Sequence, residues 1–401
     1  MRRTLLRAAG AIVVVAALLG VHVATSGTSL IIDDVSANAS AISGASASQE
    51  PGTALGEQTA QYPWAIRLQH SGEANGRILA TYTSFVDGRA EDPIFESTDD
   101  GTTFTRVGTI APGVASGNLC CTSLFELPRQ VGALPAGTLL WSGSVNANDR
   151  PMSLPVWRSD DHGRTWSPLS TCATSPNERG VWEPTFSVDE SGNLNCYFSD
   201  ESDPAHSQKL VRTVSSDGVH WGPTEEVVAL SGEESRPGMP VVDQLPDGRY
   251  FMTYEICSTT SLGCPVRYRA SSDGRNWGDA TDPGTEITGP DGRKPGHTPK
   301  FTVTSDGRIV LAAMTLHNAD GSFADGNGKV LHVNSSGGTG VWEEIPDPVT
   351  AIETNHDVGA CNNYSPALLP VGDGEKSVLE ITTREESGTC RAFYGTGEST
   401  P

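Results

Sequence analysis

The sequence has few basic residues. Its 401 residues include 27 Lys and Arg against 49 Asp and Glu, which gives a formal net charge of −22. This excess of negative charge repels phosphate backbones and anionic membrane surfaces, so nucleic-acid binding is disfavoured and neutral or cationic ligands are favoured. With 36% apolar and 19% charged residues, the chain can still bury a sizeable core, as one large domain or two ordinary ones.

Helical periodicity is missing beyond the N-terminus. The long apolar run at residues 8–19, weakly extended to residue 24, follows three arginines, which is the layout of a secretory signal. Residues 1–24 are therefore predicted to be a cleaved signal peptide of a secreted protein without stable membrane insertion; a retained membrane anchor is the alternative. The pair Arg2 and Arg3 faintly resembles a twin-arginine signal. Residues 25–61, rich in Ser, Ala and Gly, are predicted to be a flexible leader.

Paired C-x-x-C units are also missing, so a cysteine-bound metal is not expected, and no cofactor is predicted. The eight cysteines all follow the signal, and an even count in an exported chain indicates disulfides. The pairs expected are Cys257 with Cys264 across a hairpin, Cys361 with Cys390, and either Cys120 or Cys121 with Cys172.

What the sequence has in abundance is turns, with 44 Gly and 26 Pro residues. From residue 62 onward an apolar strand, a glycine turn and further β-rich strands recur about every 60 residues, which is typical of a repeat fold. The first strands are expected to begin near Tyr62, Cys121, Val181, Arg236, Gly296 and Asn363. The sequence therefore predicts an all-β chain whose residues 62–401 form a six-bladed β-propeller of four-stranded antiparallel blades. A strand from the segment before Tyr62 is expected to complete the last sheet.

Four of the repeats share a hairpin signature. Segments 97–104 and 159–166 match S-x-D-x-G-x-x-[FW], and segments 215–221 and 271–277 are one residue shorter. The pattern resembles the Asp box of sialidase-like propellers. Because Asp caps turn amides, Gly permits positive φ and the aromatic ring packs between sheets, these residues are predicted to be structural rather than catalytic. Segment 334–342 looks like a copy without its Asp.

Propeller geometry selects candidate functional residues. Strand one lines the axis, and its start lies at the same end as the end of the antiparallel strand two. Glu183 and Glu255 are the candidate catalytic residues, because a carboxylate in an apolar strand end is costly unless it is paired or functional. Capping backbone amides or pairing with Arg236 is the alternative reading of both. The candidate substrate-binding residues at this rim are Tyr62, Trp182, Asp200, Arg236, His297, Asn363 and Tyr364.

Segment 181–255, with its W-E-P at Glu183 and T-Y-E at Glu255, resembles glycoside hydrolase family 93, the exo-α-1,5-L-arabinanases. The likeness extends over most of residues 62–394. It implies a retaining enzyme on a sialidase-like six-bladed propeller that releases arabinobiose from the non-reducing end of arabinan without a metal. It also implies that Glu183 and Glu255 are the catalytic pair. A monomer acting on an oligo- or polysaccharide is expected.

Two rival functions remain open. A sialidase shares the Asp boxes, but the F/Y-R-I-P motif of sialidases is missing from this sequence. The net negative charge of the protein also disfavours binding of an anionic sugar. A non-catalytic glycan-binding propeller would have no reason to bring two glutamates together at the axis. The sequence leaves the roles of the glutamates open; Arg236, on the same blade as Glu255, could serve either carboxylate. The preferred hypothesis makes Glu183 the nucleophile and Glu255 the acid/base.

Overall fold

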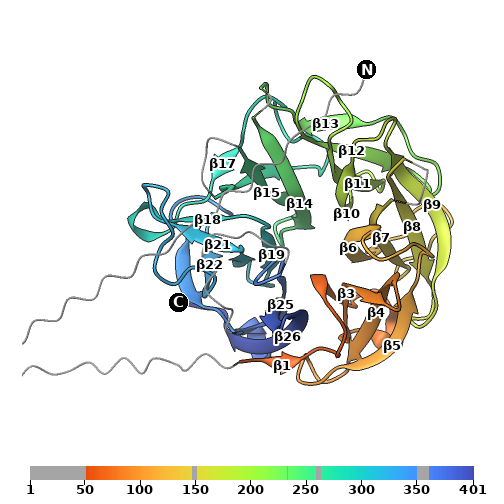
Figure 1. The fold of residues 1–401 in the computed structure, drawn as a ribbon, viewed down its shortest axis with the longest axis horizontal. Coiled ribbons are helices and arrows are strands. Elements are labelled where there is room, and N and C mark those ends of the chain that lie inside the picture. Colours follow the sequence, from red (N-terminus) through yellow and green to blue (C-terminus); the bar gives the residue numbers. More distant parts are fainter. Residues whose placement is uncertain (1–50, 147–150, 233, 259–262, 350–360) are drawn as a thin grey trace, which may run out of the picture. The chain divides into compact units, whose positions relative to one another are not determined.

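The computed structural model describes residues 51–146, 151–232, 234–258, 263–349 and 361–401, all within one compact unit of residues 48–401. The predicted signal peptide lies outside the described residues, as does the leader up to residue 50. Six four-stranded antiparallel sheets surround a central axis, as Figure 1 shows in the view along it. This confirms the predicted six-bladed propeller. Among the described residues, no helix is long and apolar enough to cross a membrane.

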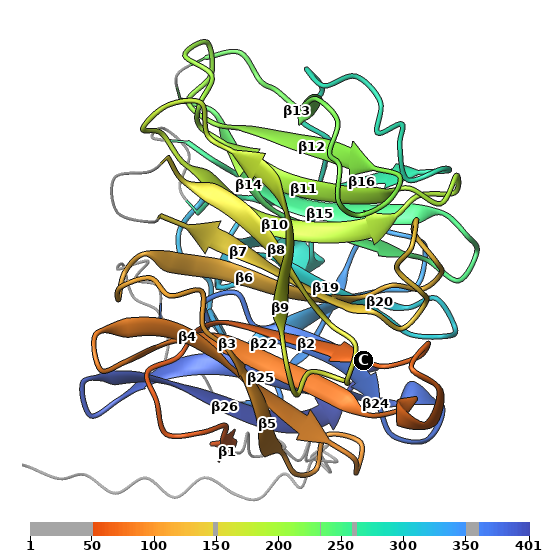
Figure 2. The same cartoon turned by 90° about the vertical axis from the view of Figure 1, so that its right-hand side faces the viewer.

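Each blade runs from an innermost strand at the axis to an outermost strand at the rim, and Figure 2 shows the blades from the side. The innermost strands are β2 (Gln61–Arg67), β6 (Leu119–Glu126), β10 (Val181–Val188), β14 (Arg236–Gln244), β19 (Lys300–Val303) and β24 (Ala367–Val371). The second strands are β3 (Ile78–Val86), β7 (Leu139–Val145), β11 (Leu194–Asp200), β15 (Tyr250–Cys257), β20 (Ile309–Ala312) and β25 (Ser377–Glu386). The third strands are β4 (Arg89–Ser97), β8 (Ser153–Ser159), β12 (Lys209–Ser215), β16 (Val266–Ser271), β22 (Val330–Asn334) and β26 (Thr389–Glu398).

The fourth strands are β5 (Thr105–Ile110), β9 (Ser167–Thr174), β13 (Glu225–Val228), β17 (Thr285–Glu286), β23 (Glu343–Pro346) and, in the last blade, β1 (Thr53–Ala54). The short β1 pairs with β26, so the N-terminal end of the described chain adds the outer strand of the C-terminal blade. A separate ribbon of β18 (Lys294–Gly296) and β21 (Thr315–His317) lies beside the fifth blade, and three 3₁₀ turns, η1 (Gly72–Ala74), η2 (Pro290–Gly292) and η3 (Asp373–Glu375), sit in loops.

The innermost strands of the fifth and sixth blades begin later than expected, at Lys300 and Ala367. The backbone explains the difference. His297 and Thr298 have positive φ, and a positive φ at Ser365 precedes Pro366. A residue in the left-handed region and a proline both interrupt a strand ladder, so pairing resumes only after them.

The Asp boxes are turns between the third and fourth strands. In the first box Ser97 Oγ donates to Asp99 Oδ1 (2.8 Å), and the Gly101 N–H donates to Ser97 Oγ (2.9 Å). The same carboxylate accepts the Thr103 N–H at 2.9 Å. In the degenerate copy, Asn334 Oδ1 accepts the Gly338 N–H at 2.9 Å and so takes the part that Ser97 plays in the first box. The boxes therefore close hairpins, as the sequence predicts.

Apolar side chains of adjacent blades bury one another. The cluster between the second and third blades includes Leu140, Phe186, Leu194 and Phe198, all at most 2% exposed. The ring of Trp221, from the third Asp box, packs against the same cluster. This packing between blades fixes the first strands around the axis, which is where the candidate site lies.

Two of the three disulfide predictions are confirmed: Cys257–Cys264 and Cys361–Cys390. The third is wrong, because Cys120 pairs with Cys121, and Cys172 pairs with Cys196 of the next blade. Cys120 lies on the innermost strand of its blade and Cys172 on the outermost, three strand spacings or ~14 Å away, beyond the reach of a disulfide.

A cavity of about 530 Å³ lies along the axis, lined by the middles and ends of the six innermost strands. None of the candidate site residues lines it. The ammonium of Lys300 lies 3.4 Å from the centroid of the Trp64 ring, and no described residue accepts a hydrogen bond from it. Burial lowers the pKa of Lys300 to about 7, although the negative charge of Glu183 partly offsets this effect. The fold therefore holds a lysine whose charged form is disfavoured.

Replacing Lys300 by Met is expected to stabilise the protein. The folded-state pKa of Lys300 lies below its ordinary value, so the penalty is fully present below about pH 7 and disappears as pH rises through the ordinary lysine pKa. The melting temperature of Lys300→Met should exceed that of the wild type by at least ~2 °C at pH 7, with a smaller gain at pH ~10. A lower melting temperature at pH 7 would mean that the contact with Trp64 outweighs the cost of burial.

Candidate active site

One residue near the start of each innermost segment has positive φ although it is not glycine. In the first four blades this residue lies within a β-bulge, where the pairing of the first strand with the second shifts in register. Such bulges re-aim a side chain relative to the regular alternation of a strand. The residues are Tyr62 (φ 51°), Cys121 (φ 62°), Glu183 (φ 57°), Met239 (φ 56°), His297 (φ 65°) and Asn363 (φ 56°). The repeat thus places six special positions at one end of the axis.

Glu183 lies in β10 and is held by the neighbouring third and fourth blades. Its Oε2 accepts a hydrogen bond from Ser199 Oγ at 2.5 Å and another from the Met239 N–H at 3.0 Å. Its own N–H donates to Ser144 Oγ at 3.2 Å. Burial raises the pKa of Glu183 to about 6, with the Ser199 hydrogen bond opposing and the charge of Glu255 adding to the shift. Glu183 therefore holds a proton more readily than an ordinary glutamate.

Glu255 lies in β15, the second strand of the fourth blade, and is 6% exposed. Its Oε2 accepts the Thr298 N–H at 2.6 Å and lies 2.8 Å from Nδ1 of His297. Burial alone would lower the pKa of His297, but attraction to Glu255 outweighs burial and raises it. Glu255 is thus surrounded by donors.

The two carboxylates face the same space. Gly238 is the cross-strand partner of Glu255, and a Cβ at Gly238 would lie 3.7 Å from Glu183 Oε2. Each charge also contributes to the raised pKa values of the two tyrosines beside the pair, Tyr62 and Tyr364. The charge of Glu255 also raises the pKa of Glu183, so the two carboxylates lie near one another.

Tyr62 and Tyr364 form an aromatic wall of this site. Their rings meet edge to face with centroids 5.1 Å apart, and the Tyr62 hydroxyl lies 3.3 Å from the Tyr364 hydroxyl. The ring of His297 meets that of Tyr364 edge to face at 5.5 Å. Burial raises the pKa of Tyr364 well above its ordinary value, so its hydroxyl stays protonated. Five of the predicted site residues thus form one cluster.

The other predicted residues have different partners. Arg236 forms an ion pair with Glu201 and donates to Gln208 Oε1 at 2.6 Å, so it pairs with neither catalytic candidate. Asp200 accepts the Ser202 N–H at 2.8 Å and caps the turn after β11. Asn363, 1% exposed, links Ala313 O with the Thr382 hydroxyl.

Trp182 neighbours Glu183 in β10, but its indole ring packs back against Gly180. A Cβ placed at Gly180 would overlap the ring. No contact joins Trp182, Asp200, Arg236 or Asn363 to the carboxylate pair within the described part of the chain. The hydrogen-bond partners of the pair also include residues that were not predicted from the sequence: Ser199, Ser144 and the backbone amides of Met239 and Thr298. No residue type in the sequence marks these amides, because the bulges and positive φ values that aim them are visible only in the structure.

Neither the known family models nor the curated protein sequences match this chain. Solved structures do. The α-L-arabinanase of Penicillium chrysogenum, solved with arabinobiose, is 28% identical over 87% of this chain and 96% of its own, with a TM-score of 0.71. The resemblance to glycoside hydrolase family 93 is confirmed.

The family 93 α-L-arabinofuranosidase of Fusarium graminearum, also solved with arabinobiose, has the same fold. It is 24% identical, with 87% of this chain and 97% of that chain covered and a TM-score of 0.69. The NanB sialidase of Streptococcus pneumoniae shares the propeller at 11% identity, with 87% of this chain and 71% of that chain covered and a TM-score of 0.54. The neighbours with the higher scores are thus glycoside hydrolases that act on arabinose-containing substrates.

Proposed function

We propose that the protein is a retaining exo-glycoside hydrolase that cleaves α-1,5-linked L-arabinan and releases arabinobiose from the non-reducing end. The observation that carries this proposal is the pair of a half-buried Glu183, with a raised pKa, and a buried Glu255 beside His297 at one end of the axis. The likeness to family 93 relatives solved with arabinobiose supports the choice of sugar.

The surroundings of the two carboxylates favour Glu183 as acid/base and Glu255 as nucleophile. A general acid needs a raised pKa, which Glu183 has. Glu255 is the candidate nucleophile because its Oε2 accepts the Thr298 N–H and lies beside His297, whose pKa is raised. This is the reverse of the assignment preferred from the sequence, in which Arg236 could serve either carboxylate. Arg236 is paired with Glu201 instead.

In the proposed mechanism, a carboxylate oxygen of Glu255 attacks the anomeric carbon of the arabinose unit. As the glycosidic C–O bond breaks, Glu183 gives its proton to the leaving oxygen, and a covalent glycosyl-enzyme forms. Glu183, now ionised, then takes a proton from a water molecule that attacks the same carbon. The second displacement frees Glu255 and restores the original anomeric configuration. This sequence requires carboxyl groups ~5–5.5 Å apart.

Substrate recognition is proposed to rest on the tyrosine wall. The edges and hydroxyls of Tyr62 and Tyr364 offer contact and hydrogen bonds to a furanose ring without any charge. A sialic acid needs cations instead, yet Arg236 binds Glu201 and Arg384 stacks on Phe393. A neutral sugar therefore fits this site better than an anionic one.

The test is hydrolysis of debranched linear arabinan beside a sialoside. The expected result is release of arabinobiose from arabinan, with the α anomer formed first, and no release of sialic acid. Release of sialic acid would refute the proposal. Binding of arabinan without hydrolysis would favour the non-catalytic propeller.

The pH dependence tests the role of Glu183. A general acid must be protonated in the free enzyme, and the pKa of Glu183 is raised to about 6, so kcat/KM should fall as pH rises above about 6. Ser199→Ala removes a hydrogen bond that favours the ionised form. That variant should move the descending limb up by ~0.5–1 pH unit. An unchanged limb would show that another group supplies the proton.

We also propose the predicted chain organisation: a signal peptide over residues 1–24, a leader over 25–61 and the catalytic propeller over 62–401, secreted as a monomer. Four disulfides among the described residues support passage through an oxidising compartment. N-terminal sequencing of the exported protein and its mass in solution test this organisation. An uncleaved N-terminus in a membrane fraction would contradict it.

A further inference from the structure

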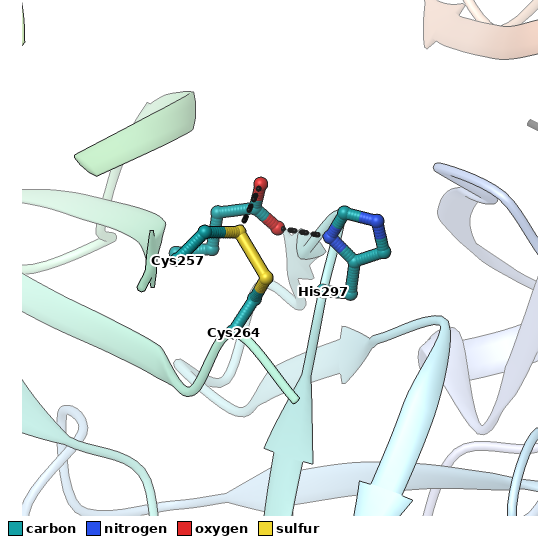
Figure 3. A group of neighbouring side chains, drawn as sticks. Cys257, Cys264 and His297 are labelled. Carbon is teal, nitrogen blue, oxygen red and sulfur yellow. Dashed lines mark hydrogen bonds and ion pairs between the residues drawn. A yellow bond between two sulfur atoms is a disulfide. The ribbon is translucent and has the colours of Figure 1, made fainter. Parts of the chain in front are cut away.

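Four potential metal ligands meet at the candidate active site. They are the carboxylate of Glu255, the imidazole of His297 and the sulfur atoms of Cys257 and Cys264, and one ligand atom from each lies within 4.8 Å of the others. Figure 3 shows the bridge between the two cysteines and the His297 ring turned toward the same point. In the oxidised state both sulfur atoms belong to a disulfide, which offers no thiolate to a metal.

We propose that reduction of the Cys257–Cys264 disulfide converts this cluster into a Zn²⁺ site that holds Glu255 and switches the hydrolase off. The metal site itself does not depend on the proposed function. Only the loss of activity rests on it.

The chemistry balances with a phosphine as the reductant. The phosphine supplies two electrons to the S–S bond and is oxidised to its oxide with an oxygen atom from water, while each sulfur takes up one proton. Zn²⁺ then displaces the two thiol protons, because thiolate is the form that binds the metal. The product is a Cys₂HisGlu site, whose ligand types are all ones that zinc accepts.

The geometry needs little rearrangement. With bonds of ~2.3 Å to sulfur and ~2.0–2.2 Å to nitrogen and oxygen, the ligand atoms of a tetrahedral zinc site lie ~3.4–3.8 Å apart. Cys257 Sγ already lies 3.4 Å from Glu255 Oε1, and Nδ1 of His297 lies 2.8 Å from Glu255 Oε2. The main change is that the two sulfur atoms separate once the bond between them is broken.

This disulfide is open to a reductant. Both Cys257 and Cys264 are partly exposed, whereas Cys172 and Cys196 are 3% and 0% exposed. A soluble phosphine should therefore reach the Cys257–Cys264 bridge well before the buried Cys172–Cys196 bridge. The core between the blades would stay linked while the site changes.

Zinc in this site would disable the proposed nucleophile, Glu255, in two ways. A carboxylate bound to Zn²⁺ has given up the lone pair with which it would attack the sugar, and His297 would coordinate the metal instead of the Glu255 oxygen. Oxidation back to the disulfide, or a chelator, would free both groups. The site would thus report the redox state of the surroundings.

The experiment uses the full chain, oxidised or treated with a phosphine, incubated with zinc and freed of unbound metal. The reduced protein is expected to retain one more zinc per chain than the oxidised protein. Cobalt in its place should give a thiolate-to-metal charge-transfer band. Equal zinc content in the two states would overturn the proposal. Far-UV circular dichroism confirms that the reduced chain is folded.

Two variants locate the site. His297→Asn keeps both cysteines and should weaken zinc binding by the reduced protein by at least ~10–100-fold. Cys361→Ser with Cys390→Ser removes another partly exposed bridge and should leave the extra zinc in place. Loss of the extra zinc in the cysteine control, or its survival in His297→Asn, would refute the assignment.

Arabinan hydrolysis supplies the second readout. Activity of the reduced protein should fall in proportion to the extra zinc and return with a chelator, while the oxidised protein is insensitive to the same zinc concentration. If the oxidised protein does not hydrolyse arabinan at all, the proposed function fails, but the zinc content still tests the site. Full activity with the extra zinc bound would disprove the switch.

Discussion

Glu255→Ala is expected to lower kcat for release of arabinobiose from linear arabinan by at least ~10⁴-fold, because no other carboxylate can form the bond to the anomeric carbon. The variant leaves the Thr298 amide and His297 facing an empty space, since both are directed at the lost Oε2. Initial rates of disaccharide release, compared with those of the wild type, measure the loss.

Azide gives this prediction a second, sharper outcome. With Glu255 removed, azide can enter from the face that the nucleophile occupied, while Glu183 still protonates the leaving oxygen. The expected product is a glycosyl azide of inverted configuration, detected by the anomeric proton in an NMR spectrum. An azide of retained configuration would show that Glu255 is the acid/base.

A matched control separates loss of chemistry from loss of charge. Glu225 lies on the outer strand β13, is exposed and pairs with Arg212 far from the axis end of its blade. Glu225→Gln should keep wild-type activity. If it lost activity as Glu255→Ala does, the effect of either variant could not be assigned to the active site.

The repeats could be predicted from the sequence because their signals are local. Each Asp box closes its own hairpin within about eight residues, as the bonds around Asp99 show, so the pattern needs no knowledge of distant segments. The run of apolar and β-branched residues in β3 or β25 likewise predicts a buried strand from one short segment. Six copies of such a unit leave few folds other than a propeller.

Features that depend on contacts between blades could not be predicted in the same way. Cys172 meets Cys196 only because the outer strand of one blade packs against the second strand of the next. Arg236 looked available to either glutamate in the sequence, but Glu201 and Gln208 of the preceding blade bind it. Such partners are separated by 24 to 35 residues and depend on how neighbouring sheets pack.

The sequence leaves the roles of the two glutamates open for a related reason. What distinguishes them is the set of backbone amides and hydroxyls around each, and those amides are aimed by positive φ at Met239 and Thr298. Neither residue is a glycine or an asparagine, the types that signal a left-handed backbone in a sequence. The repeat therefore predicted where each glutamate lies in its strand, but it did not predict which amides and hydroxyls surround the carboxylate.

Glu183→Ala is the second variant with a large expected effect, and its pattern differs from that of Glu255→Ala. Without a general acid, cleavage of arabinan should slow by ~10²–10⁴-fold, because the sugar leaving group needs a proton. An aryl arabinoside whose phenol is already acidic needs no such help. Its first displacement should stay fast while the second, which needs Glu183 as base, becomes slow.

The glycosyl-enzyme should therefore accumulate in Glu183→Ala, visible as a burst of phenol and as a mass increase of one sugar on Glu255. Azide needs no base, so it should accelerate turnover and give a glycosyl azide of retained configuration. The raised pKa of Glu183 and the donors around Glu255 both lead to this outcome. The opposite result would be a glycosyl azide of inverted configuration from Glu183→Ala and one of retained configuration from Glu255→Ala. It would exchange the two roles and support the assignment preferred from the sequence.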